Sequence, residues 1–220
     1  MNRVLIIGSN GSMGKRYQAI LKYLGVDHVC TDIHDSIFER THKFEHASHY
    51  IIATPTSTHE GYIHTLRKYE RPILCEKPLS RDPKELDNIV NMTKDPIDLQ
   101  MVNQYEHLLE GTISEGLLPL NSKSFYNYFR TGGDGLLWDC IQIIGLHNGD
   151  MKDLKINNDS PVWQSQINGH WLNFAHMDGS YVKMVDEWFS GRRFNLNKHL
   201  MWHKKVLDFN SYLIQERKNK

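Results

Sequence analysis

The 220-residue sequence has little cysteine, no excess of charge of either sign and no long apolar run, and each absence excludes a class of protein. Its three cysteines (Cys30, Cys75 and Cys140) are an odd number at wide spacing, which predicts buried thiols in a reducing compartment. Lysine plus arginine equals aspartate plus glutamate at 26 each, so no overall field points to nucleic acid or a membrane. No apolar run approaches the ~20 residues that cross a bilayer, and the apolar stretch at residues 4–7 leads into glycines instead of a signal-peptide cleavage site. We therefore expect a soluble cytoplasmic protein.

The 13 histidines do not predict a metal site. His42, His46 and His49 stand at positions i, i+4 and i+7, and His199 and His203 stand at i and i+4. A helical pair at i, i+4 binds zinc only with a third ligand and supporting residues, and no glutamate follows His199 as a metalloprotease motif requires. We expect surface histidines and no metal.

Two other local features have an ordinary and a specific interpretation. Residues 192–220 are basic, with eight Lys/Arg against Asp208 and Glu216, which favours a solvated helical tail over a polyanion site. The aromatic cluster at residues 125–129 is typical of a half-buried strand, with base stacking as the alternative.

The first 33 residues have the pattern strand, glycine loop, helix, strand. An apolar run at residues 3–7 ends at Gly8, and an apolar helical face begins at Met13 and stops at Gly25. Residues 26–33 then resemble a second strand. This is a βαβ unit, whose parallel strands imply a buried sheet that is covered by helices.

The alternation continues and then changes. We expect strands at 50–53, 72–75 and 99–102, and helices at 59–69 and 82–93. Beyond residue 120 we expect a strand at 124–130, a helix at 136–146, mixed short elements over 156–185 and a terminal helix at 199–215. The prediction is an α/β protein whose first domain, over residues 1–119, is built on this parallel sheet. A reduced C-terminal α/β domain follows over residues 120–220.

The loop Gly8-x-x-Gly11-x-x-Gly14 predicts a dinucleotide site. Asn10 occupies the usual second glycine position, but glycines at the other places still allow a tight turn and close approach of a pyrophosphate. The following helix points its N-terminal N–H groups at that phosphate. The alternative is a plain tight turn. The residues expected to contact the cofactor are Gly8, Ser9, Asn10, Gly11, Ser12 and Met13.

Asp32 stands at the end of the second strand, 18 residues after Gly14. An acidic side chain there accepts hydrogen bonds from the ribose hydroxyls of NAD and repels the 2′-phosphate of NADP. No arginine follows before Arg40, so NAD is favoured over NADP. Asp35 is an alternative for the same role, and Asp32 as a loop cap is another.

Polar residues follow three of the predicted strands: residues 54–59, then Glu76-Lys77-Pro78, and later Asn103-Gln104. Ligands of open α/β sheets bind beyond the carboxyl ends of the strands. A lysine there can hydrogen-bond a substrate hydroxyl or carbonyl and stabilise a developing alkoxide. The alternative for Lys77 is an ordinary surface lysine.

The segments VLIIGSNGSMGKR, IIATPTSTH and ILCEKPLS, in this order and spacing, resemble the Gfo/Idh/MocA oxidoreductases over roughly residues 3–103. The resemblance implies that residues 1–119 form an NAD(P)-binding Rossmann domain and that the C-terminal α/β domain over residues 120–220 has an open sheet. The unpaired face of such a sheet predicts a homodimer or larger homo-oligomer. The resemblance also implies NAD(P)-dependent oxidation or reduction of a sugar-like hydroxyl. It implies that Lys77 touches both nicotinamide ribose and substrate, and that Glu76 supports the nicotinamide end. The residues implied to line the cofactor are Thr54, Pro55, Thr56 and His59.

The second half departs from that family pattern. The stretch from Gly132 to Asp139 resembles the family's G-G-x-x-L-x-D, but the catalytic histidine expected three or four residues later is replaced by Gln142 and Ile143. Glutamine orients a hydroxyl but is no general base. We therefore expect Lys77 as electrophile or proton donor, with Asp139 and Gln142 orienting substrate. Three histidines remain as alternative sources of a base: His147, His170 and His176.

The predicted function is an NAD(P)-dependent oxidoreductase that moves hydride to or from the hydroxyl or ketone of a sugar, sugar nucleotide or cyclitol. The alternative is a catalytically degenerate cofactor-binding protein that acts as a redox sensor or scaffold. A third hypothesis, a reductase like dihydrodipicolinate reductase, shares the G-x-x-G-x-M-G loop. It lacks support here because the paired-histidine segment and K-x-D-x-P-S-G-T of that family are not found.

Overall fold

The described part of the chain forms two compact units in this computed structural model. The first combines Met1–Val102 with Met184–Asn197, and the second combines Asn103–Lys183 with Lys198–Lys220. The boundary expected near residue 119 lies outside the described residues. The structure describes residues 2–93, 97–104, 107, 126–131, 154–157, 159–167, 170–173, 178–193, 195–201, 203–204 and 207–208.

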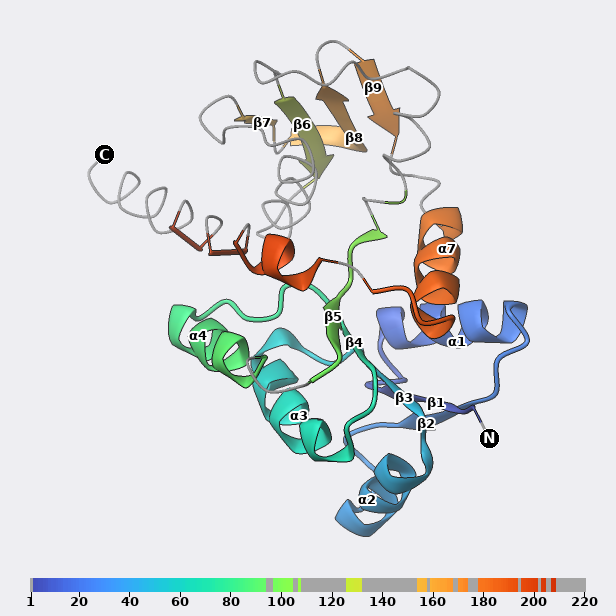
Figure 1. The fold of residues 1–220 in the computed structure, drawn as a ribbon. Coiled ribbons are helices and arrows are strands. Elements are labelled where there is room, and N and C mark those ends of the chain that lie inside the picture. Colours follow the sequence, from blue (N-terminus) through green and yellow to red (C-terminus); the bar gives the residue numbers. More distant parts are fainter. Residues whose placement is uncertain are drawn as a thin grey trace. The chain divides into compact units, whose positions relative to one another are not determined.

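The first unit is built on a parallel five-stranded sheet with the order β2-β1-β3-β4-β5 (Figure 1). Strand β1, which lies between β2 and β3, is buried along its whole length, as expected for an apolar run covered on both faces. Ile7 pairs with Thr31 and Ile52, so these strands end in line and their carboxyl ends form one edge. The strands are β1 (Val4–Ile7), β2 (His28–Thr31), β3 (His49–Ile52), β4 (Ile73–Cys75) and β5 (Leu99–Met101).

Four helices connect these strands: α1 (Ser12–Tyr23), α2 (Ile37–His46), α3 (His59–Leu66) and α4 (Pro83–Met92). Figure 1 shows α1 on one side of the sheet and α2, α3 and α4 on the other, as right-handed crossovers require when the strand order runs from β1 outward to β2 and then back past β1 to β3, β4 and β5. Every strand and helix predicted over residues 3–102 is present. The Rossmann-type fold class is thereby confirmed.

Helix α2 was not predicted. It begins at a capping box, in which Ser36 Oγ accepts from the Glu39 N–H at 3.2 Å and Glu39 Oε2 accepts from the Ser36 N–H at 2.8 Å. The pattern S-x-x-E is visible in the sequence and would have located this start. The large apolar residues of its first turn, Ile37 and Phe38, are 76% and 81% exposed, which hides the usual amphipathic pattern.

The segment Met184–Asn197, which includes the end of helix α7 (Asp178–Phe189), belongs to the first unit. Trp188 is fully buried, and its ring meets that of His49 edge-on at 5.3 Å. Arg193 bonds to Asp98 just before β5, with Nε 2.7 Å from Oδ2. Periodicity alone did not predict that a segment so late in the chain packs in the first unit.

The second unit contains an open four-stranded sheet in the order β7-β6-β8-β9. Strand β6 pairs in parallel with β7 and antiparallel with β8, which pairs antiparallel with β9. The strand predicted at 124–130 corresponds to β6, whereas the helix predicted at 136–146 lies outside the described residues. The strands are β6 (Tyr126–Thr131), β7 (Leu154–Asn157), β8 (Asp159–Ile167) and β9 (His170–Asn173).

Two expectations about single residues were wrong. His199 and His203 are 8% and 3% exposed, so the helical face that carries them points inward and they are not surface histidines. Cys30 is half-buried where full burial was expected, whereas Cys75 is buried as predicted, and neither forms a disulfide. Within the described ranges, no helix is both long and apolar enough to cross a membrane.

Candidate functional site

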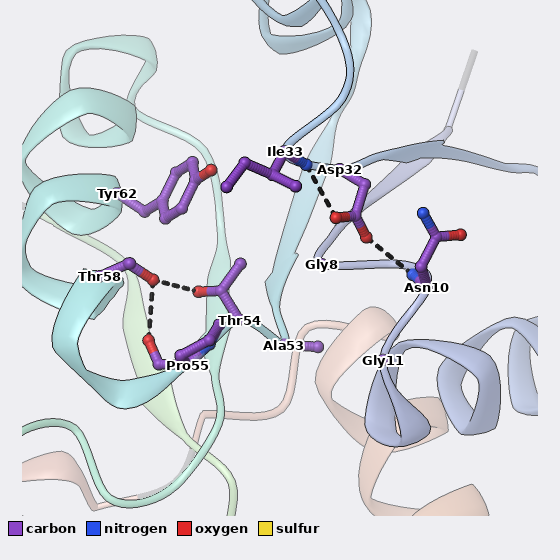
Figure 2. Close-up of a pocket in the computed structure, with 10 residues that line it drawn as sticks. All are labelled: Gly8, Asn10, Gly11, Asp32, Ile33, Ala53, Thr54, Pro55, Thr58 and Tyr62. Carbon is purple, nitrogen blue, oxygen red and sulfur yellow. Dashed lines mark hydrogen bonds between the residues drawn. The ribbon is translucent and has the colours of Figure 1, made fainter.

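A cavity of about 320 Å³ opens at the carboxyl ends of β1, β2 and β3 (Figure 2). One wall comes from the loop before α1, a second from the residues after β2, and a third from the residues between β3 and α3. All three belong to the first unit. The lining residues are Gly8, Asn10, Gly11, Asp32, Ile33, Ala53, Thr54, Pro55, Thr58 and Tyr62.

At two positions of the loop, the packing of the protein backbone alone requires glycine, whether or not a ligand binds. Gly8 has a φ of +84°, and a Cβ there would lie 2.7 Å from the Ala53 carbonyl oxygen. A Cβ on Gly14 would lie 2.2 Å from the Gly8 carbonyl oxygen and 2.7 Å from Ser9 Cα. Both positions therefore exclude any side chain, because the neighbouring atoms are backbone.

Gly11 differs from the other two glycines. Its φ of −69° suits any residue, and a Cβ there would meet the Gly8 carbonyl oxygen only at an ordinary 3.5 Å. It is the N-cap of α1 without a side-chain cap, and it lines the cavity. The space in front of Gly11 therefore borders the positive end of a helix and admits an anionic group close to the backbone.

Asp32 ties the loop to the end of β2. Its Oδ2 accepts from the Asn10 N–H and its Oδ1 from the Ile33 N–H, each at 2.8 Å (Figure 2). Each carboxylate oxygen has a second lone pair, so the side chain still accepts hydrogen bonds from a ligand hydroxyl in the cavity.

Asp35, the alternative to Asp32, is engaged elsewhere. Its Oδ2 accepts from Lys43 Nζ at 2.5 Å and from Thr31 Oγ1 at 2.7 Å. The hydrogen bond from Lys43, with a smaller contribution from Thr31, lowers the pKa of the Asp35 carboxyl. Asp35 does not line the cavity, so Asp32 is the carboxylate presented there.

The opposite wall contains Thr58, from the polar stretch at residues 54–59, and Tyr62, which the sequence patterns did not identify. Thr58 Oγ1 lies 2.8 Å from both Thr54 Oγ1 and the Pro55 carbonyl oxygen, which fixes the turn after β3. Tyr62 on α3 lies across the cavity from Ile33, whose side chain is 77% exposed (Figure 2). A rule that also takes the first turn of the helix after a strand end would have found Tyr62.

His59 lies behind this wall and does not line it. It is 1% exposed, with Nε2 2.9 Å from the Thr54 carbonyl oxygen and Nδ1 3.0 Å from that of Pro78. Burial lowers the pKa of the imidazole. The ring bridges the residues that follow β3 and β4, so it supports the cavity wall.

Glu76 and Lys77 follow β4 on the same sheet edge. The Glu76 side chain is nearly buried, and its Oε1 accepts from the hydroxyl of the fully buried Tyr17 at 2.6 Å. Its Oε2 accepts from the Lys77 N–H at 3.1 Å. Lys77 itself is half-buried. The strand-end lysine is thus held next to a carboxylate that α1 fixes in place.

The predicted residues fall into three groups. Those that line the cavity are Gly8, Asn10, Gly11, Asp32, Thr54 and Pro55. Those that lie behind it, at the start of α1, beside a neighbouring cavity or after β4, are Ser9, Ser12, Met13, Thr56, His59, Glu76 and Lys77. Asp139 and Gln142 lie outside the described residues. Across the portion of the chain that is described, no group of three or more His, Cys, Asp or Glu side chains is arranged to hold a metal ion.

Solved structures share this fold at low identity. The WlbA (WbpB) dehydrogenase from Thermus thermophilus, crystallised with NAD and UDP-GlcNAcA, is 14% identical with a TM-score of 0.70 and covers 94% of each chain. A Gfo/Idh/MocA family oxidoreductase from Vibrio cholerae is 11% identical with a TM-score of 0.73, covering 99% of this chain and 100% of that one. A myo-inositol dehydrogenase from Corynebacterium glutamicum is 13% identical with a TM-score of 0.67, covering 94% and 95%. No curated protein sequence gives a match.

The family comparison concerns the unit that carries the cavity. A family model described as an oxidoreductase family with an NAD-binding Rossmann fold matches residues 6–104. That stretch includes the glycine loop, Asp32, the β3 strand end and Glu76-Lys77, as the sequence resemblance implied. Over residues 6–104 this chain is therefore similar to the Gfo/Idh/MocA family of NAD-binding oxidoreductases.

Proposed function

We propose that this protein is an NAD(H)-dependent oxidoreductase that acts on a hydroxyl or ketone of a sugar, a sugar nucleotide or a cyclitol. The observation that carries the proposal is the cavity of the first unit. It brings a carboxylate, Asp32, and an open helix N-terminus at Gly11 to one site, on the sheet edge where Lys77 follows β4.

The residues present suit a nicotinamide dinucleotide. Gly11 leaves room in front of α1 for a pyrophosphate, and Asp32 keeps lone pairs for ribose hydroxyls. No described arginine or lysine lines the cavity to accept a 2′-phosphate, which favours NAD over NADP. Such a cofactor supplies hydride-transfer chemistry when bound.

Lys77 has the chemistry for the substrate end. Its ammonium donates hydrogen bonds to an alcohol or carbonyl oxygen and stabilises negative charge that develops there. The Lys77 backbone N–H is bonded to Glu76, which fixes the chain on which the ammonium is carried. We propose Asp139 and Gln142 as residues that orient the substrate, on the strength of the family resemblance.

Two of the solved relatives support the proposed substrate class. WlbA was crystallised with the sugar nucleotide UDP-GlcNAcA, and another structure of the same fold is a myo-inositol dehydrogenase. UDP-GlcNAcA and myo-inositol both contain a six-membered ring with adjacent hydroxyls. We extend this substrate class to the present chain as part of the proposal. We also propose that it works in the cytoplasm as a homo-oligomer.

A turnover screen tests the proposed function. The full chain is incubated with NAD+ and a panel of cyclitols, sugars and UDP-sugars, and formation of reduced nicotinamide is followed by absorbance. Lys77→Met is expected to lower kcat by about a hundredfold or more on the best substrate, in the range of a lost proton donor. The matched control is Lys84→Met, because Lys84 is an exposed lysine on α4.

The same screen distinguishes the proposed enzyme from a second candidate function, that of a cofactor-binding protein without turnover. That candidate is motivated by Gln142, which stands where the family carries a histidine. Cofactor binding with no reduction across the whole panel would favour it. Equal turnover by Lys77→Met and wild type would contradict the role of Lys77.

A further inference from the structure

We propose that Tyr17 and Glu76 form a pair that makes the site prefer the oxidised nicotinamide cofactor over the reduced one. This inference rests on the proposed function, since it assumes that the nicotinamide end of the cofactor lies beside the residues that follow β4. It assigns Glu76 as the discriminating charge and Tyr17 as the residue that positions it.

The geometry holds Glu76 in one place. Tyr17 lies one turn into α1, three residues after Gly14, and its side chain is fully buried. Its hydroxyl is 2.6 Å from Glu76 Oε1, and the Lys77 N–H is 3.1 Å from Oε2. With a donor on each oxygen, the side chain is arranged as an ionised carboxylate, which accepts on both.

Glu76 is also fixed relative to the cavity. Its backbone N–H donates to the Ile52 carbonyl oxygen at 2.9 Å, so it sits beside the end of β3. The next residues along β3, Ala53 and Thr54, line the cavity. Glu76 therefore lies at the strand-end edge of the sheet, which the cofactor has to cross.

NAD+ and NADH differ in charge only at the nicotinamide ring. The oxidised nicotinamide ring carries a positive charge that the reduced ring lacks, while the rest of the molecule is the same. A nearly buried carboxylate is little screened by water, so it stabilises the cationic ring selectively. The Lys77 ammonium opposes this effect, but its side chain is only half-buried and its charge is more strongly screened.

A ratio of dissociation constants tests the pair. The full chain and its variants are titrated calorimetrically with NAD+ and, separately, with NADH. Glu76→Gln keeps the size of the side chain but removes its charge, and is expected to raise the ratio Kd(NAD+)/Kd(NADH) about tenfold. Tyr17→Phe keeps the charge of Glu76 but removes the hydrogen bond that holds the carboxylate in place, and is expected to raise the ratio about threefold. Tyr17→His keeps a donor and is expected to restore part of the preference.

Tyr50→Phe is the matched control. Tyr50 is another fully buried tyrosine, and its hydroxyl donates to the Phe44 carbonyl oxygen at 2.6 Å, away from the cavity. Its loss removes a hydrogen bond of the same length and leaves the ratio at the wild-type value.

Each outcome decides the matter. A raised ratio in Glu76→Gln and Tyr17→Phe, with none in Tyr50→Phe, supports the pair. Equal weakening of both cofactors shows that the pair is only structural and overturns the inference, while the proposed function stands. If Tyr17→Phe does not fold, an unchanged ratio in Glu76→Gln is enough to overturn it. A wild-type chain that binds neither cofactor overturns the proposed function as well.

Discussion

Asp32 Oδ2 accepts a hydrogen bond from the Asn10 N–H at 2.8 Å, so the residue after β2 is bound to the middle of the glycine loop. This bond joins two parts of the cavity that lie 22 residues apart in the chain. The carboxylate that would meet a ribose and the loop that would meet a pyrophosphate are therefore positioned together.

Asp32→Asn is expected to weaken NADH binding about tenfold and to narrow the difference between NADH and NADPH. The amide keeps one acceptor oxygen but loses the charge that repels a 2′-phosphate. Calorimetric titration with each cofactor measures both effects. Asp35→Asn is the control, since that carboxylate is bonded to Lys43 and does not line the cavity. A variant that leaves both affinities unchanged would refute the assignment of Asp32.

Gly11→Ala and Gly14→Ala are expected to fail in different ways. A Cβ on Gly14 overlaps loop backbone, so Gly14→Ala is expected to lower the free energy of unfolding by about 2 kcal/mol or more. A Cβ on Gly11 meets no close protein atom, so Gly11→Ala is expected to keep its stability but to lose cofactor affinity. Urea unfolding and NADH titration of the two variants separate these effects.

Gly61→Ala is the control for the glycine pair. Gly61 lies inside α3, nothing stands within 4 Å of its added Cβ, and alanine is the better helix former. The free energy of unfolding of Gly61→Ala is expected to rise by roughly 0.5–1 kcal/mol, with no change in NADH affinity. Loss of stability in Gly11→Ala as large as in Gly14→Ala would contradict the distinction.

Much of the first unit could be predicted from sequence because its signals are local. Short, largely apolar runs mark β1, β3 and β4, and the glycines, Asp32 and Glu76-Lys77 stand at the strand ends where ligands bind. Helix α2 was missed because its start carries exposed Ile37 and Phe38, although the Ser36–Glu39 capping box was visible. The sequence therefore does predict the start of α2, but through the residues of its N-terminal cap and not through an apolar face.

The remaining features depend on contacts between distant residues. The Tyr17–Glu76 bond spans 59 residues, and Tyr17 looks like an ordinary member of an apolar helix face. The packing of Trp188 against His49 likewise joins segments far apart in sequence. No periodicity encodes either pair, because periodicity shows which face is buried but not what it is buried against.

The stability of the chain is expected to fall as the pH is lowered from about 7.5 to 5. Burial and the nearby Arg193 lower the pKa of His49 from 6.5, and burial lowers that of His59. Below pH 6.5 the unfolded chain therefore binds protons that the folded chain does not, which favours unfolding. Urea unfolding across this range measures the slope.

The contribution of His49 to that slope is tested by replacement. His49→Gln removes one titrating group and is expected to make the free energy of unfolding less dependent on pH between about 7.5 and 5. His64→Gln is the control, because His64 is exposed on α3. An equal slope in wild type and His49→Gln would contradict the role of His49.

Trp188→Ala is expected to lower the free energy of unfolding by about 3–5 kcal/mol, as for other large core truncations. The side chain is fully buried and meets His49 and its neighbours in the first unit. Phe38→Ala is the control, since Phe38 is 81% exposed and its loss is expected to cost less than about 0.5 kcal/mol. Both free energies are measured by urea unfolding. A loss in Trp188→Ala as small as that in Phe38→Ala would show that Met184–Asn197 does not stabilise the first unit.

The central claim is that the cavity at the ends of β1, β2 and β3 binds NAD(H), and calorimetric titration of the full chain with NADH and with NADPH tests it most directly. The account predicts saturable binding of NADH, much weaker binding of NADPH, and loss of NADH binding in Gly11→Ala at unchanged stability. Absence of NADH binding, or NADH affinity equal in wild type and Gly11→Ala, would contradict it.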